Sequence, residues 1–195
     1  RIAQTKDAGA ILDIYRPYVL SSTCTFETVV PTLEQMERRI ATGLVKFPWI
    51  VYQHQNDIGG YVYASTHRER DAYRWTCECS VYVHDDWKGK GIGLELYKAL
   101  FGILKLQGLV NVFAGITLPN NASTRLHEKC GFTHFAVYDN IGFKLGKWQK
   151  VGWWRLQLKE YELQPTPPIP FSELDPTAYS SILQSATRNF NQLMV

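Results

Sequence analysis

Residues 80–93, S-V-Y-V-H-D-D-W-K-G-K-G-I-G, carry the signals that decide how the chain folds. An apolar strand pattern ends near Val83, a glycine-rich loop follows, and an amphipathic helical pattern starts at Gly91. Glycines let the backbone turn tightly and approach a ligand closely. A helix start presents unpaired N–H groups and the positive end of the helix dipole, which suits a phosphate group. The loop therefore favours an anion site, although a plain strand-to-helix connection has the same residue pattern.

The spacing of this loop excludes several familiar nucleotide and hydrolase motifs. No G-x-x-x-x-G-K-[ST] run occurs, and Leu94 breaks the G-x-G-x-x-G spacing. Neither G-x-S-x-G nor H-E-x-x-H is present, because Lys129, Cys130 and Gly131 follow His127-Glu128. A nucleotide P-loop, a dinucleotide fold, a serine hydrolase and a zinc hydrolase therefore have no local support.

Outward from the loop, the spacing of apolar residues predicts a series of helices and strands. Helical patterns cover residues 5–19, 32–43, 91–107 and 122–129, and strand patterns cover 49–53, 58–66, 75–83, 110–116, 135–138 and 151–158. Such an order packs as a mixed sheet covered by helices on both faces. The expected fold class is therefore α/β in the broad sense, and α+β where the two classes are distinguished.

The C-terminal part of the chain has a different composition. Residues 164–170 hold four prolines and predict an extended connector. Asp175-Pro176 is a good helix start, and apolar residues recur at helical spacing from 179 to 193. We expect residues 1–163 to form one domain and 164–195 to be a connector with a helical extension. The extension would dock on its own domain or on a second subunit.

Composition limits the classes of partner. The chain has 195 residues, of which 45% are hydrophobic, enough for one well-filled core. Its net charge is +3 and no run of Lys or Arg exceeds two residues. A nucleic-acid partner is therefore not expected, since such proteins carry denser basic stripes. No apolar stretch is long enough to span a membrane, so a membrane partner is not expected either.

The four cysteines indicate a reducing environment. Cys24, Cys77, Cys79 and Cys130 form no CxxC pair, and no histidine spacing completes a zinc site. We expect reduced thiols, no metal and a cytoplasmic protein. The chain starts at Arg1 and not at Met, so the sequence leaves open an upstream targeting segment.

Residues 88–93 resemble the acetyl-CoA loop of the GNAT superfamily, [RQ]-x-x-G-x-[GA], with Lys88 in place of Arg or Gln at the first position. The likeness extends to the phosphinothricin acetyltransferase family from about residue 2 to residue 170. It is carried by residues 78–83, 115–120, 126–128 with 131–132, and 142–144 with Trp148 and 151–152. The resemblance implies a GNAT fold, with a mostly antiparallel mixed sheet in which the strands around Val83 and Ala114 splay apart. It also implies acetyl-CoA as co-substrate and no metal.

The same resemblance implies a set of cofactor-binding residues. The backbone of Val81, Tyr82 and Val83 would pair with the pantetheine arm like an added strand. The pyrophosphate would be wrapped by Lys88, Gly89, Lys90, Gly91, Ile92, Gly93 and Leu94. Asn120 would bond the cofactor near its reactive end, and Ser123 completes the set.

Glu78 is the candidate general base. It lies on the strand that runs into the loop, and a carboxylate acting through water can accept the proton that an ammonium group must lose. The resemblance gives this glutamate the same role. A surface glutamate paired with Arg70 or Arg74 is the alternative. Tyr138 lies where many GNAT enzymes keep a tyrosine that protonates the leaving thiolate.

The candidate substrate residues lie in two loops. Arg68, Arg70 and Tyr73 precede the strand of Glu78, and by the resemblance they would hold the acidic end of an amino-acid substrate. Alternating charges on a solvated loop are the alternative reading of that segment. Phe26 and Glu27 would wall the substrate pocket, or else only fasten their own loop.

The expected function is direct transfer of an acetyl group from acetyl-CoA to the amine of a small amino-acid-like substrate. Phosphinothricin, methionine sulfoximine and methionine sulfone are the expected types. A protein or peptide N-acetyltransferase and a non-catalytic acyl-CoA-binding module are the alternatives. The resemblance and the apolar stripe after residue 179 favour a homodimer.

Overall fold

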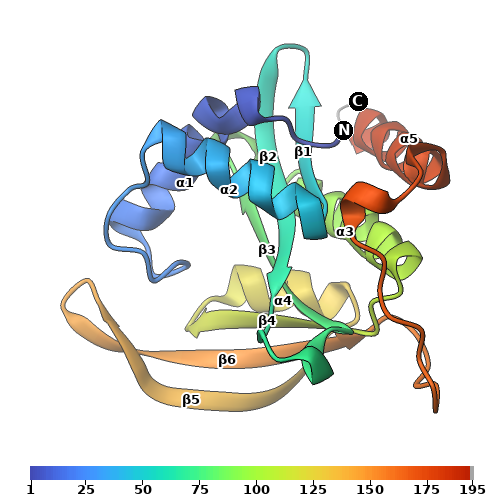
Figure 1. The fold of residues 1–195 in the computed structure, drawn as a ribbon. Helices are drawn as coiled ribbons and strands as arrows, with labels where there is room; N and C mark the ends of the chain where they lie inside the picture. Colours follow the sequence, from blue (N-terminus) through green and yellow to red (C-terminus); the bar gives the residue numbers. More distant parts are fainter. Residues whose placement is uncertain (194–195) are drawn as a thin grey trace.

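A single six-stranded sheet organises the computed structural model, which describes residues 1–193 (Figure 1). The strands are β1 (Trp49–His54), β2 (Asp57–Thr66), β3 (Thr76–Val83), β4 (Asn111–Leu118), β5 (Thr133–Lys144) and β6 (Lys147–Gln157). Their order in the sheet is β1-β2-β3-β4-β6-β5. Only the β3–β4 pair is parallel, and every other neighbouring pair is antiparallel. The expected mixed, mostly antiparallel sheet is confirmed.

Helices cover both faces of this sheet, as the sequence predicted (Figure 1). One face carries α1 (Ala8–Ser21) and α2 (Leu33–Lys46), and the other carries α3 (Ile92–Gln107) and α4 (Asn121–Lys129). The last helix, α5 (Pro176–Leu193), packs outside α3. Short 3-10 turns are η1 (Thr5–Asp7), η2 (Asp71–Tyr73), η3 (Asp85–Trp87) and η4 (Phe171–Glu173).

Local signals set the helix ends. At the start of α2, the Thr32 side chain accepts from the Gln35 N–H and the Gln35 side chain accepts from the Thr32 N–H. This capping box satisfies two N–H groups that the first turn would leave unpaired. Gly108 ends α3 in the left-handed region at φ +90°, which costs glycine little.

The apolar stripes of the helices fill two cores. On one face, Leu96, Leu100 and Leu104 of α3 pack against the sheet around Val112. On the other face, buried residues of α1 and α2 meet aromatic residues of β2 and β3; they include Ile11, Tyr15, Met36, Tyr61 and Tyr82. Both sheet faces are therefore buried near β3, which fixes the strand that carries the candidate base.

The β5–β6 hairpin is longer than the sequence indicated. Strands were expected at 135–138 and 151–158, but pairing extends to Lys144 and Lys147. The intervening Asp, Asn and Gly residues are typical of a loop, yet they form a bulge in an edge strand, with Asn140 at φ +51°. Leu145 and Gly146, both at positive φ, make the two-residue turn.

The C-terminal helix lies against its own chain. Asp175 caps it by accepting from the Thr177 N–H at 2.9 Å, as the Asp-Pro pair predicted. Ala186 and Phe190 of its apolar stripe are buried, and Ile182 packs closely on Gly102 of α3. The side chain of Leu193, the last member of the predicted stripe, lies outside the described residues.

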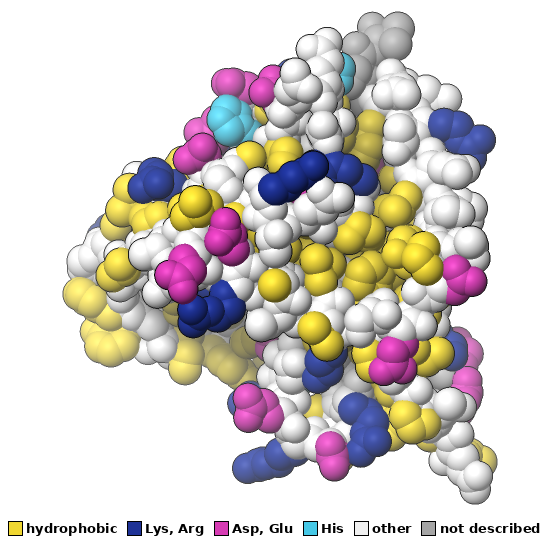
Figure 2. Space-filling view, turned by 45° about the horizontal axis from the view of Figure 1, so that its top comes forward, with side chains coloured by type: hydrophobic (Ala, Val, Ile, Leu, Met, Phe, Trp, Pro, Cys, Tyr) yellow, Lys and Arg dark blue, Asp and Glu magenta, His cyan; other side chains and the backbone are white. Residues whose placement is uncertain are grey.

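Surface features add three observations. On the face that Figure 2 shows, Lys and Arg side chains are interspersed with Asp and Glu and gather in no basic stripe. Among the helices of residues 1–193, none has the length and apolarity needed to cross a membrane. All four cysteines are free thiols, and the described residues hold no group of three potential His, Cys, Asp or Glu metal ligands.

Candidate active site

The parallel strands β3 and β4 separate part-way along the sheet. They pair only from Thr76 opposite Asn111 to Glu78 opposite Phe113. Beyond this point β3 stays paired with β2 and β4 stays paired with β6. The edge of β3 that faces β4 is therefore left unpaired after Glu78, which provides backbone groups for an added strand. The expected splay of these two strands is confirmed.

A cavity of about 560 Å³ opens at this separation. The structure brings eleven of the twelve predicted cofactor residues to its wall: Val81, Tyr82, Val83, Lys88, Gly89, Gly91, Ile92, Gly93, Leu94, Asn120 and Ser123. Lys90 is not among the lining residues; its ammonium lies 4.7 Å from the centre of the Trp87 ring. The cavity thus runs from the end of β3 to the N-termini of α3 and α4.

Glycine geometry shapes the α3 end of the cavity. Gly89 and Gly91 have φ values of +78° and +79°, which side chains disfavour. The Gly91 carbonyl accepts from the N–H groups of Leu94 and Glu95, so the helix begins there. A Cβ at Gly93 would lie 3.1 Å from Leu126 of α4. These residues leave a narrow backbone cradle at the positive end of the α3 dipole.

Charge and aromatic contacts hold Lys88 beside the cradle. Its ammonium pairs with Asp85 and lies 4.9 Å from the centre of the Tyr18 ring. The Tyr18 hydroxyl donates to the Val83 carbonyl at 2.7 Å. Lys88, exposed and anchored by these contacts, is available to an anion in the cavity.

The α4 wall contains a histidine with every ring nitrogen bonded. His127 Nδ1 lies 2.8 Å from the Ser123 carbonyl, which can only accept, so Nδ1 carries the proton. Burial lowers the pKa of His127, so the ring is neutral and Nε2 accepts from the Tyr97 hydroxyl at 2.9 Å. His127 therefore packs and bridges two helices, and its place next to the cavity is structural.

Glu78 has a partner that the sequence did not indicate. Its Oε1 lies 2.7 Å from His67 Nδ1. The alternative pairing with Arg70 or Arg74 is wrong, because Arg74 pairs with Asp71 at 3.5 Å and no ion pair joins Arg70 to Glu78 within residues 1–193. The β2–β3 register pairs Thr66 with Cys77, which brings the next residue, His67, close to Glu78; the sequence alone does not give this register.

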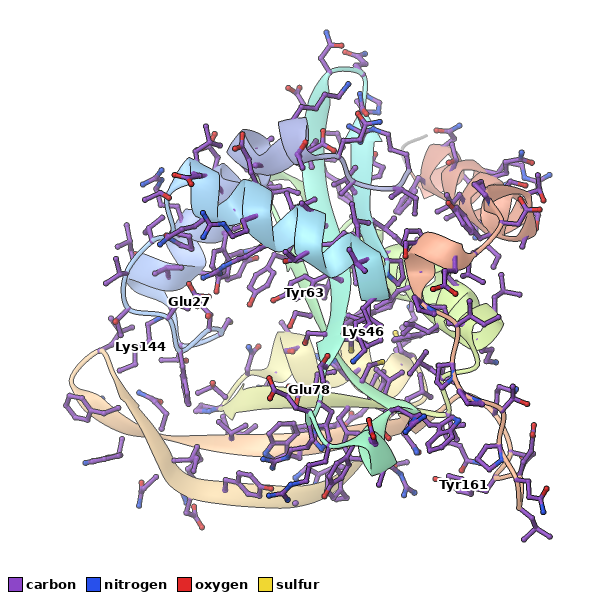
Figure 3. The ribbon with its side chains drawn as sticks, viewed as in Figure 1. Glu27, Lys46, Tyr63, Glu78, Lys144 and Tyr161 are labelled. Carbon is purple, nitrogen blue, oxygen red and sulfur yellow. The ribbon has the colours of Figure 1, made fainter. Side chains whose placement is uncertain are left out.

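The loop between α1 and α2 is fastened to the β4-β6-β5 half of the sheet. Lys144, 4% exposed at the end of β5, donates to the carbonyls of Thr25 at 2.7 Å and Tyr18 at 3.3 Å. Burial lowers the pKa of this ammonium. Thr117 of β4 donates to the Thr23 carbonyl at 2.7 Å. Figure 3 shows Lys144 beside the loop that carries Glu27.

Phe26 and Glu27 make different contacts within that loop. The Phe26 ring lies against the Gly142 backbone, where a Cβ would approach it to 2.3 Å. Glu27 forms two hydrogen bonds with Arg39 of α2, at 2.6 and 3.1 Å. Phe26 thus connects the loop to β5, and the Glu27 carboxylate is occupied by Arg39.

The other predicted site residues lie outside the cofactor cavity. Arg68 and Arg70 are exposed on the connection between β2 and β3. Tyr73 is 40% exposed, with its ring edge-on to His67 at 5.9 Å. Tyr138 is exposed on β5, and its ring centre is 5.7 Å from that of Trp153. The structure gathers Glu78, His67 and Tyr73 at one place and leaves Tyr138 on the outer strand.

Comparison with known proteins decides the family. The model of the acetyltransferase (GNAT) domain matches residues 1–153, which include β3, the glycine loop and α3. The chain belongs to the GNAT acetyltransferase family. It is therefore an N-acetyltransferase, and the alternative of a non-catalytic module is set aside.

Relatives narrow the family further. The chain is 35% identical to a phosphinothricin N-acetyltransferase of Streptomyces viridochromogenes, over 87% of this chain and 91% of that protein. It is 34% identical to an L-methionine sulfoximine/L-methionine sulfone acetyltransferase of Salmonella typhimurium, over 83% and 95%. A phosphinothricin acetyltransferase from Sinorhizobium meliloti, solved with AcCoA, superposes with a TM-score of 0.80 at 30% identity, over 88% and 96%. This GNAT chain is thus a member of the phosphinothricin and methionine sulfoximine acetyltransferase family.

Proposed function

We propose that this GNAT enzyme transfers an acetyl group from acetyl-CoA directly to the amine of a small amino-acid-like substrate. Phosphinothricin, methionine sulfoximine and methionine sulfone are the proposed substrate types, in line with the names of the relatives. The observation that carries the proposal is the 560 Å³ cavity at the β3–β4 split. The N-terminus of α3 lies at one end of this cavity, and the pairing of β3 with β4 ends at Glu78 beside it.

The cavity wall suits the parts of acetyl-CoA. The unpaired edge of β3 at Val81–Val83 offers backbone groups to the amides of the pantetheine arm. The cradle at residues 89–94 offers helix N–H groups to the pyrophosphate, and Lys88 adds positive charge. Asn120 and Ser123 lie at the start of α4, on the opposite wall. Lys90 would contribute to pyrophosphate binding only through the long-range electrostatic field of its charge.

Glu78 would accept the proton that the substrate ammonium must lose before it can attack. Its side chain is 32% exposed, so a bridging water can reach it. The freed amine attacks the thioester carbon, a strand N–H stabilises the oxyanion, and the C–S bond then breaks. Tyr138 would protonate the thiolate. Tyr138 does not line the cavity, so this role needs a direct test. Unchanged turnover in a Tyr138→Phe enzyme would remove Tyr138 from the mechanism.

The acceptor side would use the two loops that flank Glu78. Arg68 and Arg70 are free to turn toward a carboxylate or an oxyanion, and Tyr73 borders the Glu78–His67 pair. Phe26 would supply an apolar wall from the opposite loop, with Glu27 holding that loop through Arg39. Two arginines on the connection that leads into the strand of Glu78 favour a small anionic amino acid over a peptide.

We also propose a homodimer that uses the β5–β6 hairpin. Large apolar side chains are exposed along it, namely Phe135, Val137, Tyr138, Ile141, Phe143, Leu145 and Trp148. An edge hairpin with so many exposed apolar groups is a liability for a monomer and suits a second copy. Sedimentation of a Phe143→Glu/Trp148→Glu variant tests this proposal, and an unchanged dimer would contradict it.

A thiol-release assay tests the function. Acetyl-CoA is offered with phosphinothricin, methionine sulfoximine, methionine sulfone or a lysine peptide. Fast release with one of the three small molecules is expected. Release with the peptide alone would replace the substrate proposal with the peptide alternative, and a Glu78→Gln enzyme with full turnover would remove Glu78 as the base.

A further inference from the structure

His67 lies at the junction where β3 and β4 separate. It follows the last residue of β2, and three aromatic rings from three elements surround it. Its ring stacks on Phe113 of β4 at 5.0 Å with an interplanar angle of 16°. Tyr73 of η2 and Trp153 of β6 meet it edge-on at 5.9 and 6.3 Å. Packing alone therefore fixes the plane of the imidazole.

The two contacts of His67 converge on one rung of the sheet. Phe113, on which it stacks, is the register partner of Glu78, with which it bonds. This pair is the last rung before the strands splay. The side chain that directly follows β2 thus contacts both members of the last paired position of β3 and β4, which borders the reaction site.

The chemistry of the bond assigns its direction. An ionised carboxylate can only accept, so the proton between Glu78 Oε1 and His67 Nδ1 belongs to Nδ1. The separation of 2.7 Å is in the range of charge-assisted N–H···O bonds. Because Oε1 is used in this way, Oε2 remains for an incoming ammonium or its bridging water.

We propose that His67 is a positioning residue that orients the Glu78 carboxylate for proton removal. This inference rests on Glu78 acting as the base. His67 acts through Glu78, because a rigid ring on Phe113 fixes Oε1 and thereby aims Oε2. A flexible glutamate at the edge of a solvated split would otherwise sample several rotamers and spend less time in the reactive one.

Two substitutions separate orientation from packing. His67→Phe keeps a flat ring on Phe113 and removes the N–H donor, whereas His67→Asn keeps a donor near the Nδ1 position. We expect His67→Phe to lower kcat about tenfold, the usual effect of losing one hydrogen bond to a charged group. The KM for acetyl-CoA should stay within about twofold, because His67 is not part of the cavity wall. His67→Asn should recover most of kcat.

A double-mutant cycle with Glu78→Gln decides whether His67 acts through Glu78. In the Glu78→Gln background, His67→Phe should change the residual kcat by less than about twofold. His134→Phe, a substitution of an exposed histidine that packs on Trp154 of β6, is the matched control and should leave kcat unchanged. Thermal melting and acetyl-CoA binding verify that each variant is folded.

Each outcome has one meaning. A wild-type kcat in His67→Phe, with Glu78→Gln nearly inactive, would overturn the positioning role and leave the base intact. A tenfold loss that persists in the Glu78→Gln background would show that His67 acts independently of Glu78, and this also overturns the proposal. Full turnover by Glu78→Gln alone would show that Glu78 is not the base, and the proposal that His67 positions it would then fail as well.

Discussion

The ammonium of Lys144 donates to the carbonyl oxygen of Thr25 at 2.7 Å, joining the end of β5 to the loop that precedes α2. The two residues are 119 positions apart in the chain. Lys144 is almost fully buried, and its ammonium donates hydrogen bonds to backbone carbonyls. It forms an ion pair with no carboxylate in the described part of the chain. Burying an ammonium group costs free energy unless its hydrogen bonds are made. The two hydrogen bonds of Lys144 are therefore expected to hold the loop in one position.

Lys144→Met should loosen the loop and weaken binding of the amine substrate. The substitution removes donors to two carbonyls while keeping most of the apolar stem. We expect the KM for the amine to rise about tenfold, given the usual 1–3 kcal/mol for an unsatisfied buried acceptor, with the KM for acetyl-CoA unchanged. Lys147→Met, at an exposed position in the same hairpin, is the control. Equal KM values for the two variants would contradict the role of Lys144 in holding the loop.

Gly91→Ala should weaken acetyl-CoA binding. Gly91 is at φ +79°, where a residue with a Cβ is strained by about 1–2 kcal/mol, so the cradle would shift away from the phosphate. We expect the dissociation constant measured by calorimetry to rise about tenfold. Gly9→Ala in α1, where a Cβ meets nothing within 4 Å, is the matched control and should stabilise the fold slightly. Tight cofactor binding by Gly91→Ala would remove the cradle from the site.

His127 should make stability fall as the pH decreases below neutral. Burial lowers its pKa in the folded chain, so between that pKa and the unfolded value near 6.5 the unfolded chain binds a proton that the folded chain lacks. The stabilisation is complete above about pH 6.5 and is lost toward lower pH, at up to about 1.4 kcal/mol per pH unit. Denaturant midpoints from pH 5 to 8 measure this slope, which should be shallower in His127→Gln. His134→Gln, at an exposed position on β5, should keep the wild-type slope.

The glycine loop was predictable from sequence, whereas the partners of Glu78 and Lys144 were not. Glycines at positive φ and a helix start are determined by the local sequence, so the conformation of residues 88–94 can be predicted from those residues alone. The His67–Glu78 bond depends on the β2–β3 register, and the Lys144–Thr25 bond joins residues that are 119 positions apart in the chain. β5 was predicted too short because an edge-strand bulge and a loop share the same polar residues.

Phe190→Ala should destabilise the fold through the α5–α3 contact. Phe190 is buried and its ring centre lies 4.4 Å from that of Tyr52, and next to it Asn189 donates to Glu95 of α3 at 2.7 Å. Truncation of a buried phenylalanine costs about 3–5 kcal/mol, with the lower end expected for a terminal helix. Asn191→Ala, at an exposed neighbour, should leave the denaturant midpoint unchanged. If Phe190→Ala instead alters only the sedimentation coefficient, α5 serves the second subunit.

Arg68→Ala and Arg70→Ala should change recognition of the acidic substrate without changing the chemistry. Arg68 and Arg70 are exposed on the connection that begins at His67, so we expect them to close on a carboxylate when substrate arrives. Each loss should raise the KM for methionine sulfone or phosphinothricin about tenfold, the usual value for one charged hydrogen bond, with kcat nearly constant. Arg16→Ala, at an exposed position on α1, is the control. If the amine KM stays constant in the double variant, the loop is only a solvated charged segment and the acidic end of the substrate binds elsewhere.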